Sequence, residues 1–152
     1  MPDTSTDSLP CILLPLQNHY LLLPNAAVIS VSAITPLSSS PNKPEFWLGE
    51  YAWQSQKIPV LDLESLIEES APDTEDVKKL CIVRSLNNDN DLEAYGFTGH
   101  GSSQLIQINQ AALQLSDTQK DSNFLHCQIQ IGNKIAYLPN LDNIEIMIQR
   151  QQ

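Results

Sequence analysis

The sequence predicts a mostly-β protein with about nine short strands and few, short helices. Short apolar runs recur along the chain, and several alternate strictly with polar residues. In "AVISVSA", for example, Ile29, Val31 and Ala33 share one face. Turn residues separate the runs at close intervals, such as the two-residue hairpin signal Gly132-Asn133. Such spacing is typical of barrels and sandwiches, and two small barrels in tandem fit the number of strands best.

The first third of the chain predicts three strands and a loop. Residues 1–8 are expected to form a disordered tail, because "MPDTSTDS" has little to bury. Pro15 predicts an edge strand for "CILLPL", since proline cannot donate a ladder hydrogen bond. Asn18 marks a turn into a second strand from Tyr20, and "AVISVSA" forms the third. The prolines and serines of "TPLSSSPNKPEF" then exclude regular structure.

Two strands and a helix are expected next. The strands cover residues 48–53 and 58–63. In "DLESLIEES" the period changes to helical, with Leu63, Leu66 and Ile67 on one side and acidic residues on the other. Asp62 is expected to cap this helix.

The remaining elements alternate between strands and turns, and the chain closes with a helix. "KLCIVRSL" and "EAYGFTG" predict a hairpin around the turn "NNDND". "NQAALQL" predicts a short helix or turn, and an apolar stripe with Asn140 as its cap predicts the final helix. The other strands are "SQLIQI", "LHCQIQI" and "KIAYLP", and the stripe consists of Leu141, Ile144, Met147 and Ile148.

The composition restricts the classes of partner. The formal net charge is −10, from 8 basic and 18 acidic residues. Nucleic acids and anionic membranes are polyanions, so neither is an expected partner. The N-terminus lacks the basic and apolar pattern of a signal peptide, and no apolar run approaches the ~20 residues that span a bilayer. We therefore expect a cytoplasmic protein without direct membrane insertion.

No motif for catalysis, metal or cofactor binding stands out. The histidines lack metal-ligand spacing, and the glycine-rich stretch 96–103 lacks the lysine of a phosphate loop. The cysteines at 11, 81 and 127 are expected to be buried, reduced thiols. In "LHCQIQI", Cys127, Ile129 and Ile131 are expected to face inward. A β-barrel enzyme using Cys127 or His126 stays open as an alternative, without a motif to support it.

Three stretches together resemble the CheW-like domains of bacterial chemosensory adaptors. That family has the pattern G-x-x-N-L-R-G-x-x-x-P-x-x-D-L before a helix, which Gly49, Pro59, Asp62 and Leu63 match here. "YGFTGHGSSQLIQI" is similar to the family's V-G-x-x-V-D-x-V-x-x-V-x-x-I, with Gly96 in place, and "GNKIAYLPNLDNI" is similar to its closing motif. The resemblance covers nearly the whole chain, and the matching stretches occur in the same order and at similar spacing.

The resemblance implies two SH3-like, five-stranded β-barrel lobes, with short helices and a C-terminal helix, in a single domain over residues 9–152. The first lobe is expected to contain about residues 9–70 and 135–152, and the second about residues 77–134. It also implies a non-enzymatic adaptor without a cofactor. The adaptor would couple the cytoplasmic tip of a chemoreceptor to a CheA-type histidine kinase, through the kinase's CheW-like regulatory domain.

One departure concerns the charged signature of the family. Its N-L-R-G falls on Ala52-Trp53-Gln54-Ser55, so Gln54 replaces the arginine. Gln is uncharged and offers fewer donors than Arg, which favours a neutral partner surface. In this respect the chain is similar to divergent, ChpC-type relatives of pilus-linked chemosensory systems, which suggests control of type IV pili and twitching motility. The missing arginine equally motivates a decoy or regulatory paralogue that binds one partner alone.

The expected partner-binding residues form two groups. Trp53, Gln54, Ser55, Gln56 and Lys57 are expected at a barrel rim, with Trp53 either a core residue or a hot spot. Receptor contacts are expected around Ala27, Val28, Gln54 and Gln56.

Overall fold

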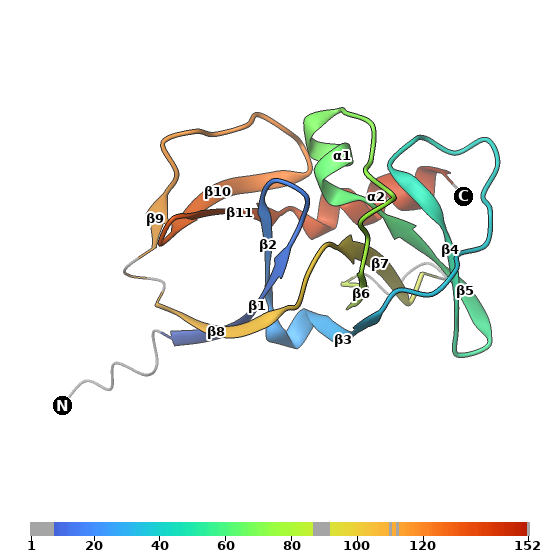
Figure 1. The fold of residues 1–152 in the computed structure, drawn as a ribbon, viewed down its shortest axis with the longest axis horizontal. Helices are drawn as coiled ribbons and strands as arrows, with labels where there is room; N and C mark the ends of the chain where they lie inside the picture. The colour runs from blue at the N-terminus through green and yellow to red at the C-terminus, as the bar shows by residue number, and fades with distance from the viewer. Residues whose placement is uncertain (1–7, 87–91, 110, 112, 152) are drawn as a thin grey trace.

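The computed structural model of the chain describes residues 8–86, 92–109, 111 and 113–151. The protein is mostly β, with short helices and a C-terminal helix (Figure 1). The strands are β1 (Ser8–Pro15), β2 (Tyr20–Pro24), β3 (Val28–Ala33), β4 (Trp47–Trp53), β5 (Gln56–Leu61), β6 (Lys79–Arg84), β7 (Ala94–Gly99), β8 (Gln104–Asn109), β9 (Gln114–Leu115), β10 (Leu125–Ile131) and β11 (Lys134–Pro139). The helices are the 3-10 turn η2 (Asn25–Ala27), α1 (Leu63–Glu68) and α2 (Leu141–Gln151).

The strands form two sheets, one for each lobe. The first has the order β8-β1-β2-β11-β10-β9, and the second has the order β3-β6-β7-β5-β4. All neighbours are antiparallel except β2–β11 and β5–β7. A bridge between Ser38 and Glu50 joins the segment after β3 to β4, so the second sheet curls toward closure.

The strand pairing differs from the expected lobe ranges. The expected first lobe combined β3, β4 and β5 with the C-terminal segment, whereas these strands share one sheet with β6 and β7. Strands β8 to β10, expected in the second lobe with β6 and β7, join β1, β2 and β11 instead. The cause is long-range pairing, such as the parallel contact of Tyr20 with Ala136, which local spacing does not encode. The first sheet also has six strands instead of five, because Gln114 and Leu115 form the short β9.

The largest hydrophobic core takes residues from both sheets and both helices. Leu21 of β2, Phe97 of β7 and Leu63 of α1 are fully buried within it. The predicted stripe of α2 is confirmed: Leu141, Ile144 and Ile148 are buried, and Met147 packs against the same core. Asn140 caps this helix, since its Oδ1 accepts a hydrogen bond of 3.1 Å from the Asn143 N–H. The core therefore fixes the two lobes to each other.

The edge-strand prediction from Pro15 is wrong, because β1 pairs with β2 on one side and β8 on the other. The proline is tolerated because its pairing with β8 has already ended, at Leu13. Its carbonyl accepts a hydrogen bond of 2.8 Å from the His100 N–H instead. The expected tail is one residue shorter than predicted, since Ser8 begins β1; residues 1–7 lie outside the described residues, as does the predicted turn at residues 87–91.

The inward face predicted for β10 is only partly correct. Ile129 is buried, but Cys127 and Ile131 are only half-buried. The ladder with β11 is irregular between Leu125 and Cys127, and the extra residue, His126, shifts the alternation. Of the three cysteines, all of them free thiols, Cys127 is thus the one that is not buried as expected.

No helix of the described residues is long and apolar enough to cross a membrane.

Candidate partner-binding surface

The predicted rim residues form the tip of the β4–β5 hairpin. Trp53 and Gln56 are the last paired residues, and Gln54 and Ser55 make the two-residue turn between them. Both turn residues have positive φ, 46° and 67°, as in a type I′ turn. Asn and Gly usually occupy such positions, so this polar turn carries left-handed backbone strain at two exposed residues.

The side chains beside the turn have mixed environments. Trp53 is half-buried and packs on the core of the second sheet, whereas Trp47 is buried in the core between the lobes. Gln56 Nε2 donates a hydrogen bond of 3.0 Å to Oε2 of Glu93, and Lys57 is exposed. The tip therefore presents polar groups beside the partly exposed ring of Trp53.

Ala27 and Val28 lie in a separate patch. They end η2 and begin β3, which is at the opposite end of the sheet order from β4. Both are half-buried against the core between the lobes, whereas Trp53 belongs to a different cluster. The structure does not bring the two groups of expected binding residues together.

Residues of the family motif are buried, closely packed or engaged as a helix cap. Gly49 has a φ of 150°, and a Cβ there would lie 2.5 Å from the Ser38 carbonyl oxygen. At Gly96 a Cβ would lie 2.8 Å from Cδ1 of Leu80. Asp62 caps α1 as predicted, accepting a hydrogen bond of 3.0 Å from the Ser65 N–H. Pro59 is buried in β5, and Leu63 is fully buried at the start of α1.

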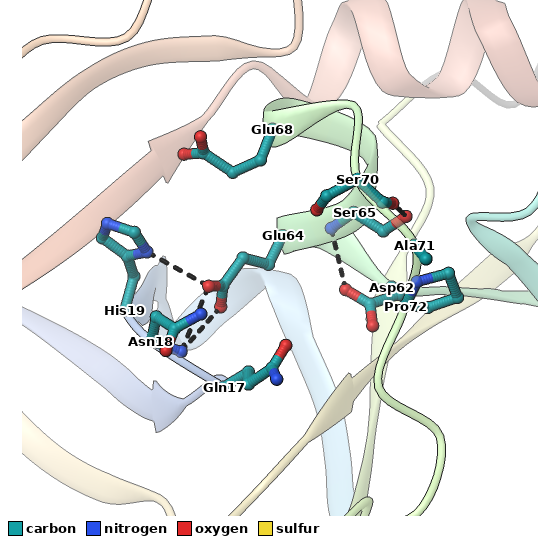
Figure 2. A pocket seen from close by; sticks show the side chains of 10 residues that line it. All are labelled: Gln17, Asn18, His19, Asp62, Glu64, Ser65, Glu68, Ser70, Ala71 and Pro72. Carbon is teal, nitrogen blue, oxygen red and sulfur yellow. Dashed lines mark hydrogen bonds and ion pairs between the residues drawn. The ribbon is translucent and has the colours of Figure 1, made fainter.

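A polar cavity of about 240 Å³ adjoins α1 (Figure 2). Both carboxylate oxygens of Glu64 accept hydrogen bonds of 3.1 Å from the Asn18 N–H, and Oε2 lies 3.2 Å from His19 Nδ1. Glu64, on the side of the helix expected to be polar, is therefore buried and only 6% exposed. The turn between β1 and β2 supplies the donors that make its burial tolerable, and sequence spacing did not reveal this contact.

Other polar side chains lie beside the Glu64 carboxylate and this cavity. The Tyr137 hydroxyl donates a hydrogen bond to Glu68 and lies 3.1 Å from His19 Nδ1. Burial raises the pKa of Asp62, and Glu64 nearby raises it further, although the Ser65 N–H opposes the shift. These contacts connect α1 to β11 and to the β1–β2 turn, which is a structural role. Among the described residues, no group of His, Cys, Asp and Glu is arranged to hold a metal ion.

A further surface feature is the absence of charge over long stretches. No Asp, Glu, Lys or Arg occurs in residues 8–42 or 94–116, although the chain contains 26 such residues (8 basic plus 18 acidic). These stretches include β1, β2, β3, β7, β8 and β9. In Figure 1, β8, η2 and β3 follow one another along the lower side of the molecule. The charge of the protein is therefore concentrated elsewhere on its surface.

The fold defines a two-lobed, mostly-β protein. The model of the CheW-like domain family matches residues 10–146, so the chain belongs to this family. Its fold is similar to the crystal structure of the scaffolding protein TtCheW from Thermoanaerobacter tengcongensis. The two chains share 19% identity with a TM-score of 0.69, over 88% of this chain and 89% of the other. No curated protein sequence matches the chain.

Proposed function

We propose that the protein is a cytoplasmic, non-enzymatic chemosensory adaptor that couples a chemoreceptor to a CheA-type histidine kinase. Membership of the CheW-like family supports an adaptor role. The tip of the β4–β5 hairpin is the observation that supports an uncharged interface with a partner protein. There an uncharged turn, Gln54-Ser55, is exposed beside the half-buried Trp53. A partly exposed aromatic side chain within a polar rim is typical of a binding hot spot.

We assign the hairpin tip to the kinase and the patch around Ala27 and Val28 to the receptor. The two patches pack on different hydrophobic clusters, which suits a protein that holds two partners at once. The receptor patch borders an uncharged part of the chain, so its contact would depend on apolar burial more than on ion pairs.

A binding titration against the CheW-like regulatory domain of the kinase tests the first contact. The wild type should bind at micromolar concentration with weak salt dependence, as expected for an uncharged interface. Trp53→Ala should weaken binding by about tenfold or more, as loss of a hot spot does. Ala33→Asp, on an exposed position of β3, is the control. If the wild type does not bind the kinase domain but Gln54→Arg does, the wild-type protein has lost this partner.

A simultaneous pulldown distinguishes a bridging adaptor from a decoy paralogue. Receptor and kinase fragments recovered together through the protein support bridging, and Ala27→Asp should remove the receptor alone. If the protein recovers the receptor or the kinase fragment but never both together, the result would support the decoy paralogue instead. Control of type IV pili stays a prediction, which twitching and swimming assays of a deletion strain separate.

A catalytic role for Cys127 or His126 finds no support in the electrostatics. Burial raises the pKa of the Cys127 thiol, so the nucleophilic thiolate is disfavoured at neutral pH. Retention of receptor and kinase binding by Cys127→Ser is the expected result.

A further inference from the structure

Strand β8 ends the first sheet, and along it Leu105, Gln107 and Asn109 are exposed residues. Of the described strands, β1 alone pairs with β8, through the register Leu13–Gln104 to Ser8–Asn109. The Pro15 carbonyl bonds to His100, on the β8 side of the strand, so odd-numbered residues of β1 direct their backbone groups toward β8. In an antiparallel ladder, opposite residues bond to each other. The backbone groups of Leu105, Gln107 and Asn109 therefore point away from β1, to the open edge.

This edge lacks the features that prevent strands from pairing in solution. Monomeric proteins usually protect edges with charges, prolines or bulges. The sequence of β8, "QLIQIN", has no charge or proline, and its register with β1 is regular. Leu105 is 63% exposed on the solvent face of the strand.

The charge distribution indicates which molecule would cover the edge. With a net charge of −10, two copies of the chain repel each other over most of their surfaces. Strand β8 and its neighbour β1 lie within the stretches that contain no Asp, Glu, Lys or Arg, so two copies meeting there bring no carboxylates together. A basic partner would instead be attracted to the acidic remainder of the surface.

We propose that two copies of the chain associate by antiparallel pairing of their β8 strands, with the two-fold axis at Gln107. In this register Gln107 lies opposite Gln107 of the second copy, and Leu105 lies opposite Asn109. The three residues with outward-directed backbones are thus all paired, and the first sheet continues from one molecule into the next. The interface is small, so the dimer is a weak one, formed at high local concentration. This proposal does not depend on the proposed adaptor role.

Charge substitution at the axis tests the proposal on the full chain by sedimentation equilibrium. The wild type should dimerise with increasing concentration. Gln107→Lys and Gln107→Glu should each weaken dimerisation about fivefold or more, because each places like charges opposite each other. An equimolar mixture of the two variants should recover association, since Lys then lies opposite Glu. Ser32→Lys, on an exposed position of β3, is the matched charge control and should dimerise as the wild type does.

Three results would overturn the proposal: a wild type that stays monomeric at every concentration, variants that dimerise unchanged, or a mixture that associates no better than either variant alone. Far-ultraviolet circular dichroism confirms that each variant is folded. The mixture contains the same two variants that were measured alone. A partial loss of stability in one variant would therefore not produce a recovery of association on mixing.

Discussion

The hydroxyl of Tyr95 donates a hydrogen bond of 2.9 Å to Oε2 of Glu145, and neither side chain is exposed to solvent. The same carboxylate accepts bonds from the Ser85 hydroxyl and the Leu86 N–H. It therefore connects α2 to β7 and to the end of β6. Its donors compensate for the cost of burying a carboxylate. Burial raises the pKa of Tyr95, and the charge and hydrogen bond of Glu145 raise it further.

Glu145→Ala should lower the free energy of unfolding by about 3 kcal/mol, because several buried donors lose their acceptor. Glu145→Gln keeps the shape and one acceptor, so its effect should be smaller. Ile146→Ala, at an exposed position of the same helix, is the control. Urea unfolding measures all three, and equal losses for the two Glu145 variants would contradict this account.

Gly49→Ala should destabilise the protein by more than about 2 kcal/mol, since the new Cβ would lie 2.5 Å from the Ser38 carbonyl oxygen. The Ser38–Glu50 bridge that closes the second sheet would have to open. The matched control is Gly132→Ala: its φ is 59°, but nothing lies within 4 Å of the new Cβ. It should show only the left-handed backbone cost of about 1 kcal/mol. If thermal melts rank the two variants equally, the close contact is not responsible.

Ser55→Gly should stabilise the hairpin by about 1 kcal/mol, because glycine adopts the φ of 67° without strain. Ser55→Ala keeps the Cβ and should leave the unfolding free energy nearly unchanged. Ala52→Gly, in the adjoining strand, should be destabilising. Chemical denaturation of the three variants checks the order. A destabilising Ser55→Gly would show that the serine contributes a contact of its own.

The stability of the fold should decrease at alkaline pH. Burial raises the pKa of Cys81 from 9.0 to about 12, so the folded protein holds a proton that the unfolded chain has lost within that window. The contribution of this group is complete below pH 9 and is lost toward pH 12, at up to about 1.4 kcal/mol per pH unit. Cys81→Ala should make the pH dependence of unfolding shallower between these values. Parallel curves for the variant and the wild type would exclude Cys81 as the cause.

Local sequence features predicted most elements of this protein. Asp62 and Asn140 cap their helices as expected, since a cap depends on residues three positions apart. The stripe of α2 packs on the core because helical periodicity is also local. The family pattern led us to expect Gln54 and Ser55 at a barrel rim, whereas their two-residue turn and its positive φ angles became visible in the structure alone.

Contacts between distant residues account for the failures. Glu64 lies on the expected polar side of α1 but is buried, because the turn at Asn18, 46 positions away, supplies a hydrogen-bond donor. Cys127 departs from the expected alternation because β10 contains one extra residue between Leu125 and Cys127. The two groups of expected binding residues pack on different hydrophobic clusters: Ala27 and Val28 lie against the core between the lobes, and Trp53 lies against the core of the second sheet.

The sequence by itself determined the mostly-β class, the helices with their caps, the excess of negative charge and the family resemblance. These depend on periodicity, turn chemistry and composition, which act over a few residues or over none. Only the tertiary structure decided which strands share a sheet, which carboxylates are buried and which edge stays open. Those outcomes depend on pairing and burial across the whole chain, where many arrangements satisfy the same local pattern and the most favourable packing selects one.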